Sequence, residues 1–172
     1  KETMAAVSLT DFYDFCCLNK ITTLMPGILT HWPIHTDAEK ELLSYWQAEA
    51  TNLVFLEYKK ISLVRSLVSL AKEQNLWLLF FILYILADQY PNYALRVSSD
   101  TDLLILPKDI PTITKILNSL GYSHVKALEK KNVSTFLYEE DDYPVHKIEL
   151  HTSLFEDLDG PRISFLEQLR LA

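Results

Sequence analysis

The sequence predicts an α+β fold, in which a mixed β-sheet core has helices mainly on one face and follows a helical N-terminal region. Two observations indicate this. Apolar residues recur at three- and four-residue steps through most of the first 71 residues, which is the period of an amphipathic helix. After residue 75, short apolar runs alternate with turn residues and with further helical patterns. We expect a helical region over residues 1–74 and the core over residues 75–172, packed as one compact unit.

The residue pattern in the first half of the sequence predicts two helices. Residues 9–18 follow helical spacing, and turn residues then interrupt the pattern at Pro26, Gly27 and Pro33. Thr36 and Glu39 match a capping box, in which the Thr hydroxyl accepts from the Glu N–H and the Glu carboxylate reaches back to the Thr N–H. From this box to Ala71 we expect one helix, continuous or bent once.

The second half predicts the elements of the core. We expect strands at residues 76–81, 101–106, 122–127, 134–138 and 145–151, and helices at 82–90, at 111–120 and from 160 to 172. Pro111 in the first turn of its helix and Gly121 just after the last turn are typical helix boundaries. Residues 139–144, with sequence EEDDYP, are expected to form a hairpin loop.

Charge and composition exclude several classes of partner. The chain has 16 Lys and Arg against 23 Asp and Glu, a net charge of −7, so we expect no non-specific nucleic acid binding. The longest apolar run, residues 76–87, is shorter than the roughly 20 residues of a membrane span, so no membrane association is expected. The chain has only 3 glycines, which argues against a Gly-rich phosphate loop.

The two cysteines, Cys16 and Cys17, are adjacent. Neighbouring residues are poorly placed for a disulfide, so we expect reduced thiols, at least one of them packed in a helix. Reduced thiols are typical of a reducing compartment, and no signal peptide opens the sequence, so we expect a cytoplasmic location.

The segment from Arg96 to Leu106 carries the chemistry. Asp100 and Asp102 are two residues apart, so on a strand their side chains point to the same face. Four apolar residues follow them, which places the two aspartates at the beginning of a buried strand. Two neighbouring carboxylates repel each other unless a cation lies between them, and Mg²⁺ is the natural choice. Glu149, on another expected strand, is the candidate third ligand. The alternatives are a capped turn for the two aspartates and an outward-facing polar residue for Glu149.

These residues resemble the polymerase-β-type nucleotidyltransferase superfamily, whose pattern is two aspartates on one strand and a third acid on a later strand. The match is more detailed with a bacterial branch of proteins known only as uncharacterised nucleotidyltransferases. The matching residues are Tyr90-Pro91, Arg96, Asp100-Thr101-Asp102-Leu103-Leu104, Gly121-Tyr122 and Glu149-Leu150-His151. The resemblance covers about residues 40–155, and a helical region that follows the core in similar proteins is expected to lie beyond Ala172.

The resemblance implies a Mg²⁺-dependent enzyme that transfers a nucleotidyl group from a nucleoside triphosphate, of unknown identity, to the hydroxyl of an unknown acceptor. Asp100, Asp102 and Glu149 would be the catalytic metal ligands, and Arg96 and Ser99 would bind the nucleotide. A structural ion pair with Asp100 is the alternative for Arg96, and a capping or turn role is the alternative for Ser99. His151 would be either a partner of the ligands or a structural histidine.

One segment departs from the superfamily. Its members have a glycine at the start of the helix after the first core strand, where backbone N–H groups approach the phosphates. Here the corresponding residues are Phe81-Ile82-Leu83-Tyr84. Three interpretations stay open: an altered phosphate site, a ligand other than a nucleoside triphosphate, or a catalytically degenerate domain that binds a protein partner.

Overall fold

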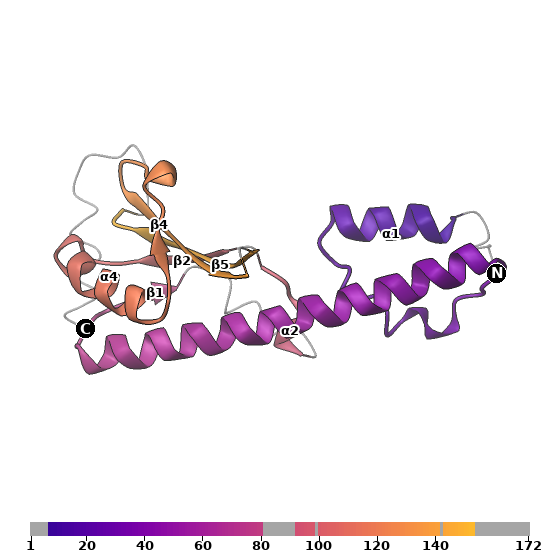
Figure 1. Ribbon diagram of the computed structural model, residues 1–172, viewed down its shortest axis with the longest axis horizontal. Coiled ribbons are helices and arrows are strands. Elements are labelled where there is room, and N and C mark those ends of the chain that lie inside the picture. Colours follow the sequence, from indigo (N-terminus) through magenta and orange to yellow (C-terminus); the bar gives the residue numbers. More distant parts are fainter. Residues whose placement is uncertain (1–6, 81–91, 99, 142, 154–172) are drawn as a thin grey trace. The chain divides into compact units, whose positions relative to one another are not determined.

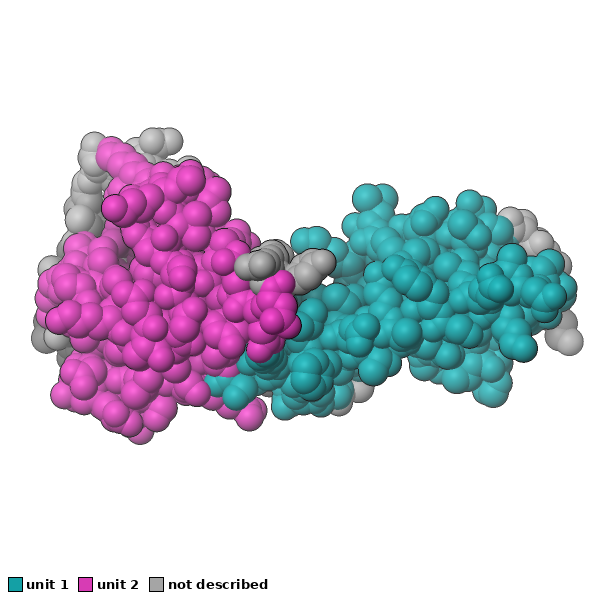
Figure 2. All heavy atoms as spheres, in the orientation of Figure 1, with its two compact units in different colours: residues 1–62, 82–98 teal, residues 63–81, 99–172 magenta. Residues whose placement is uncertain are grey.

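The computed structural model describes residues 7–80, 92–98, 100–141 and 143–153. Within these residues it confirms the predicted α+β class, with three α-helices and a mixed five-stranded sheet (Figure 1). The chain divides into unit 1, residues 1–62 with 82–98, and unit 2, residues 63–81 with 99–172 (Figure 2). Helix α2 (Asp37–Glu73) contributes residues to both units. Among the described residues, no helix combines the length and the apolar character that a bilayer span requires.

Unit 1 is built on helix α1 (Leu9–Leu18) and the first part of α2. The Ser8 hydroxyl caps α1 by accepting a hydrogen bond from the N–H of Asp11. The core of the unit is an aromatic and aliphatic cluster around Trp46, which is fully buried and donates its indole N–H to the carbonyl of Thr22 at 2.8 Å. The helix predicted at residues 9–18 is confirmed. Its residues Leu9, Phe12, Tyr13 and Cys16 pack in this cluster, whereas Phe15 and Leu18 are exposed.

The two cysteines are both free thiols, as predicted. Cys16 is buried in the cluster of unit 1, and this burial raises the pKa of its thiol. Cys17, one step further around the helix, is exposed.

The capping box at the start of α2 forms as predicted. The Glu39 N–H donates to the Thr36 hydroxyl at 3.2 Å, while Glu39 Oε2 accepts from the N–H groups of His35 at 2.7 Å and Thr36 at 2.9 Å. The bond from His35 is the main reason that the pKa of Glu39 lies below its ordinary value of 4.5. Two N–H groups beside the first turn of the helix are therefore bonded by one charged carboxylate.

Glu39→Gln is expected to reduce stability in a pH-dependent way. Because the folded-state pKa of Glu39 is lowered, the stabilisation by its carboxylate is complete above the ordinary pKa of 4.5. It disappears as the pH falls through the folded-state pKa. Urea unfolding of wild type and variant from pH 7 downwards should therefore show a stability difference that vanishes in acid. A difference independent of pH would contradict the role of the charge.

The sheet of unit 2 has the strand order β1-β2-β5-β4-β3. Strands β2 and β5 pair in parallel, and the other neighbours pair antiparallel. The bounds are β1 Leu79–Phe80, β2 Asp100–Leu104, β3 Ser123–His124, β4 Val133–Glu140 and β5 Tyr143–His151.

Several predicted boundaries change in the structure. The strand predicted at residues 122–127 is only two residues long, because the chain bends into a 3₁₀ turn at Lys126–Leu128. The hairpin loop predicted at residues 139–144 is mostly strand: Glu139 and Glu140 continue the β4–β5 ladder, and Asp141 turns the chain with a φ of 49°. The helices predicted at residues 82–90 and from 160 to 172 lie outside the described residues.

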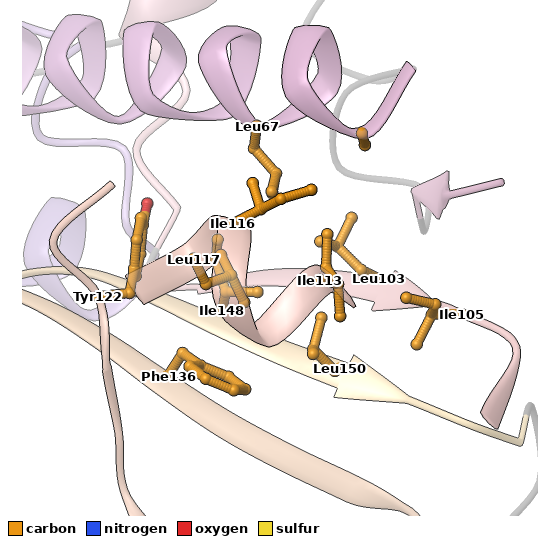
Figure 3. Packing of buried hydrophobic residues seen from close by; sticks show 11 residues of the cluster. Leu67, Leu103, Ile105, Ile113, Ile116, Leu117, Tyr122, Phe136, Ile148 and Leu150 are labelled. Atoms are coloured by element: carbon orange, nitrogen blue, oxygen red, sulfur yellow. The ribbon is translucent and has the colours of Figure 1, made fainter. Parts of the chain in front are cut away.

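One face of the sheet is covered by helices, as predicted. Helix α4 (Ile110–Ser119) and the end of α2 pack on it, and Figure 3 shows Leu67 of α2 projecting toward Ile116 of α4. The buried cluster consists of Leu67, Ala71, Leu103, Ile105, Ile113, Ile116, Leu117, Tyr122, Phe136, Ile148 and Leu150. Gly121 ends α4 with a φ of 89°, and a Cβ at this position would lie 3.1 Å from the Tyr138 ring. This packing leaves the alternate residues of β2 and β5 for the opposite face.

Candidate metal and nucleotide site

The parallel pairing of β2 with β5 brings the predicted acidic residues together. Asp100 pairs in register with Lys147, and Asp102 pairs with Glu149. Residues two apart on a strand share a face, and so do register partners on neighbouring strands. Asp100, Asp102, Lys147, Glu149 and His151 therefore share the face opposite the helix-covered core, which is called the acidic face below.

Lys147 connects two of the carboxylates. Its Nζ lies 3.1 Å from Asp100 Oδ2 and 2.8 Å from Glu149 Oε1. The hydrogen bond to Glu149 is the main cause of a raised pKa for Lys147, and the bond to Asp100 adds to it, whereas partial burial acts in the opposite direction. The lysine is therefore positively charged at neutral pH and balances part of the acidic charge of the site.

The imidazole of His151 lies near both Asp102 and Glu149. His151 Nε2 lies 3.0 Å from Asp102 Oδ1 and 3.9 Å from Glu149 Oε2. One possible ligand atom from each of Asp102, Glu149 and His151 lies within 4.8 Å of the others. The three side chains are between 22% and 30% exposed, so the group is screened by protein yet open to a small ligand.

The donor atoms of this group fit a divalent cation. Carboxylate oxygens are preferred ligands of Mg²⁺, and imidazole nitrogen suits the first-row transition metals. An octahedral ion with ligands at 2.0–2.1 Å holds adjacent ligand atoms about 3 Å apart and opposite ones about 4 Å apart. The distances from His151 Nε2 to the two carboxylates already lie at these values, so a small ion needs little movement of the strands.

A buried histidine supports the strand from the opposite face. His146 is 2% exposed, with Nε2 2.8 Å from the Thr101 hydroxyl and Nδ1 2.7 Å from the Tyr122 hydroxyl. Thr101 lies between the two aspartates in sequence, so this network joins β2 to β5 directly behind the acidic residues. His146 was not predicted from the sequence, although its spacing of three from Glu149 places it on the core face of β5.

In unit 1, a buried ion pair binds the segment that precedes β2. Lys60 Nζ lies 3.2 Å from Glu57 Oε2 and also donates to the carbonyl of Ser98, whose own N–H donates to Glu57 Oε2 at 3.3 Å. Both charged residues are only 7% exposed. This anchors Ser98 to α2, two residues before Asp100 in the chain.

The predicted nucleotide-binding residues precede β2 in the sequence. Arg96 lies in unit 1, partly buried, at the end of the 3₁₀ turn Tyr93–Leu95. Ser99 and the segment Phe81–Tyr84 lie outside the described residues. The nucleotide-binding roles of Arg96 and Ser99 stay predictions, and so does metal ligation by Asp100, Asp102 and Glu149.

Comparison with known proteins gives one match. The sequence model of a family described as "Uncharacterised nucleotidyltransferase" matches residues 20–170, which is well over half of the chain. The match confirms the predicted resemblance to nucleotidyltransferases, while the assignment to a bacterial branch stays a prediction. No curated protein and no solved structure matches the sequence.

Proposed function

Because the chain belongs to the uncharacterised nucleotidyltransferase family, we propose that it is a Mg²⁺-dependent enzyme that transfers a nucleotidyl group from a nucleoside triphosphate to a hydroxyl acceptor. The observation that carries the proposal is the placement of Asp102 and Glu149 as register partners on parallel strands, with His151 on the same face. An acidic face of this kind is suited to a cation and, through the cation, to phosphate oxygens.

The transfer forms one bond and breaks another. The acceptor hydroxyl loses its proton to water, its oxygen bonds to the α-phosphorus, the bond from this phosphorus to the oxygen that bridges it to the β-phosphate breaks, and pyrophosphate leaves. Bound Mg²⁺ supplies a lowered pKa for the acceptor hydroxyl and charge compensation for the phosphates. In our proposal Asp102 and Glu149 bind the ion, His151 lies beside them with Nε2 3.0 Å from Asp102 Oδ1, and Lys147 holds Asp100 and Glu149 in place.

Arg96 and Ser99 are the proposed nucleotide-binding residues. A guanidinium can bond two phosphate oxygens at once, which makes arginine suited to a triphosphate. Arg96 precedes Asp100 by four residues in the sequence, and Ser98, between them, contacts Glu57 and Lys60 of α2.

A second function remains a candidate because of the segment Phe81–Tyr84, which has no glycine. A large side chain where phosphates approach the backbone would weaken triphosphate binding. In that case the domain would bind a protein partner instead of catalysing transfer.

Thermal unfolding with each of the four nucleoside triphosphates distinguishes these functions. We expect one or more triphosphates to raise the melting temperature in Mg²⁺ but not in EDTA. A ligand at 100 times its dissociation constant stabilises a protein by about 2.7 kcal/mol, which is a shift of a few degrees. The Asp100→Asn/Asp102→Asn variant should lose the shift, whereas the control Asp109→Asn, outside the acidic face, should retain it.

Two results would count against the proposal. An equal shift in EDTA would contradict a role for Mg²⁺. The absence of a shift with all four triphosphates, in protein whose circular dichroism shows a folded state, would contradict nucleotide binding and favour the protein-binding function.

A further inference from the structure

We propose that the ammonium group of Lys147 fills one of two cation positions among the carboxylates, so that the protein without nucleotide binds a single divalent ion at Asp102, Glu149 and His151. The inference rests on the proposed function, because it concerns the same acidic face. It goes further by assigning a separate position to each of the two cations, the ammonium group and the metal ion, and by placing His151 among the ligands.

The contacts of Glu149 separate the two positions. Its Oε1 lies 2.8 Å from Lys147 Nζ, and its Oε2 faces His151 Nε2 at 3.9 Å. Asp100 contacts Lys147 at 3.1 Å, whereas Asp102 contacts His151 at 3.0 Å. The acidic face therefore has a lysine half and a histidine half, and Glu149 belongs to both.

In the lysine half, the ammonium group of Lys147 lies between the two carboxylates. Contacts of 3.1 and 2.8 Å between an ammonium nitrogen and two carboxylate oxygens are direct ion pairs. A metal ion between Asp100 and Glu149 would therefore have to displace Nζ. Lys147 is directed there by the strand itself, since it pairs with Asp100 in register and lies two residues before Glu149.

The histidine half has the spacing that a single ion requires. Ligand atoms of an octahedral ion lie about 3 Å apart when adjacent and about 4 Å apart when opposite. The ligand atoms of Asp102, Glu149 and His151 lie within 4.8 Å of one another, so small side-chain adjustments complete the site. Asp100 does not belong to this group.

The charges of the side chains also indicate a single divalent ion. Asp100, Asp102 and Glu149 carry three negative charges when ionised, and Lys147 supplies one positive charge. The remaining two negative charges match one divalent ion. A second divalent ion would give the nucleotide-free site an excess of positive charge next to the ammonium group.

The test is a Mn²⁺ titration of the complete chain without nucleotide, in which electron paramagnetic resonance measures the free ion. Mn²⁺ is the probe because it accepts both carboxylate oxygen and imidazole nitrogen. We expect one bound ion per chain for the wild type and two for Lys147→Met, which keeps the length of the side chain but removes its charge. Lys147→Arg restores a positive charge and should return to one ion. Lys115→Met, on the exposed side of α4, is the control and should also bind one.

Each other result overturns the proposal. Two ions in the wild type would show that Lys147 gives way to metal, and one ion in Lys147→Met would show that the lysine does not fill a cation position. If His151→Ala binds Mn²⁺ as tightly as the wild type, the assigned ligand set is wrong. None of these three results decides whether triphosphate raises the melting temperature in Mg²⁺. The proposed function is therefore tested separately, by that melting experiment. If the wild type binds no Mn²⁺ and shows no such shift, the inference and the proposed function both fail.

Discussion

Glu57→Ala is expected to lower the free energy of unfolding by about 3–5 kcal/mol, because it leaves the buried ammonium group of Lys60 without its carboxylate partner. Both residues are 7% exposed. Glu57 Oε2 accepts from Lys60 at 3.2 Å and from the N–H of Ser98 at 3.3 Å, so the substitution removes the acceptor from both donors. Water has little access to replace it at this depth.

Urea unfolding of the variant beside Glu41→Ala measures this cost. Glu41 is an exposed residue of the same helix, and its substitution should change stability by less than about 0.5 kcal/mol. The double variant Glu57→Leu/Lys60→Met should lose less than Glu57→Ala, since apolar side chains of similar size replace the pair and no buried charge remains. If Glu57→Ala and Glu41→Ala cost the same, the pair is not a buried interaction of this strength.

The sequence does contain a pattern that indicates this pair. The apolar positions of α2 include Leu53, Ile61 and Val64, and the same helical face passes through position 57. A Glu there, with a Lys three residues later, indicates two charges on the buried side of a helix. Their common partner, Ser98, was unpredictable because a contact across 38 to 41 residues has no local pattern.

The two strands of the acidic face were predictable for a similar reason. Alternation of apolar and polar residues gave the faces of Asp100, Asp102 and Glu149, and the structure keeps them. The register was not predictable, because it depends on which residues of β2 lie beside β5. Lys147 was not predicted for this reason. The alternation of side chains along β5 places it on the same face as Glu149, but only the pairing register places it opposite Asp100.

The boundaries of the edge strand β3 could not be predicted from the local sequence either. Residues 122–127 were predicted as one strand, but the ladder with β4 covers only Ser123 and His124, and Val125 adds a single N–H donation to the carbonyl of Thr135. The length of an edge strand depends on where its partner offers free hydrogen-bonding groups, which is information from another part of the chain. Helix α4 was predicted to within one residue at each end because its boundary residues, Pro111 and Gly121, are local.

The two aspartates, which look equivalent in the sequence, are expected to differ in metal binding. Asp102→Asn should weaken Mn²⁺ binding to the nucleotide-free protein by more than about 100-fold, whereas Asp100→Asn should weaken it by about 10-fold. Loss of a residue that only supports the ligands typically costs 10–100-fold, so loss of a ligand should cost more. Asp102 belongs to the group with Glu149 and His151, and Asp100 contacts Lys147.

Isothermal titration calorimetry of the two single variants measures this difference, with Asp109→Asn as a control that should bind like the wild type. Asp109 lies before α4, outside the acidic face. Equal losses in the two variants would make both aspartates ligands of the first ion and would contradict the separation into two halves. A larger loss in Asp100→Asn would reverse the assignment, because the ion would then occupy the position given to Lys147. The difference between the variants depends on register and contacts, since both substitutions remove one charge from the same strand.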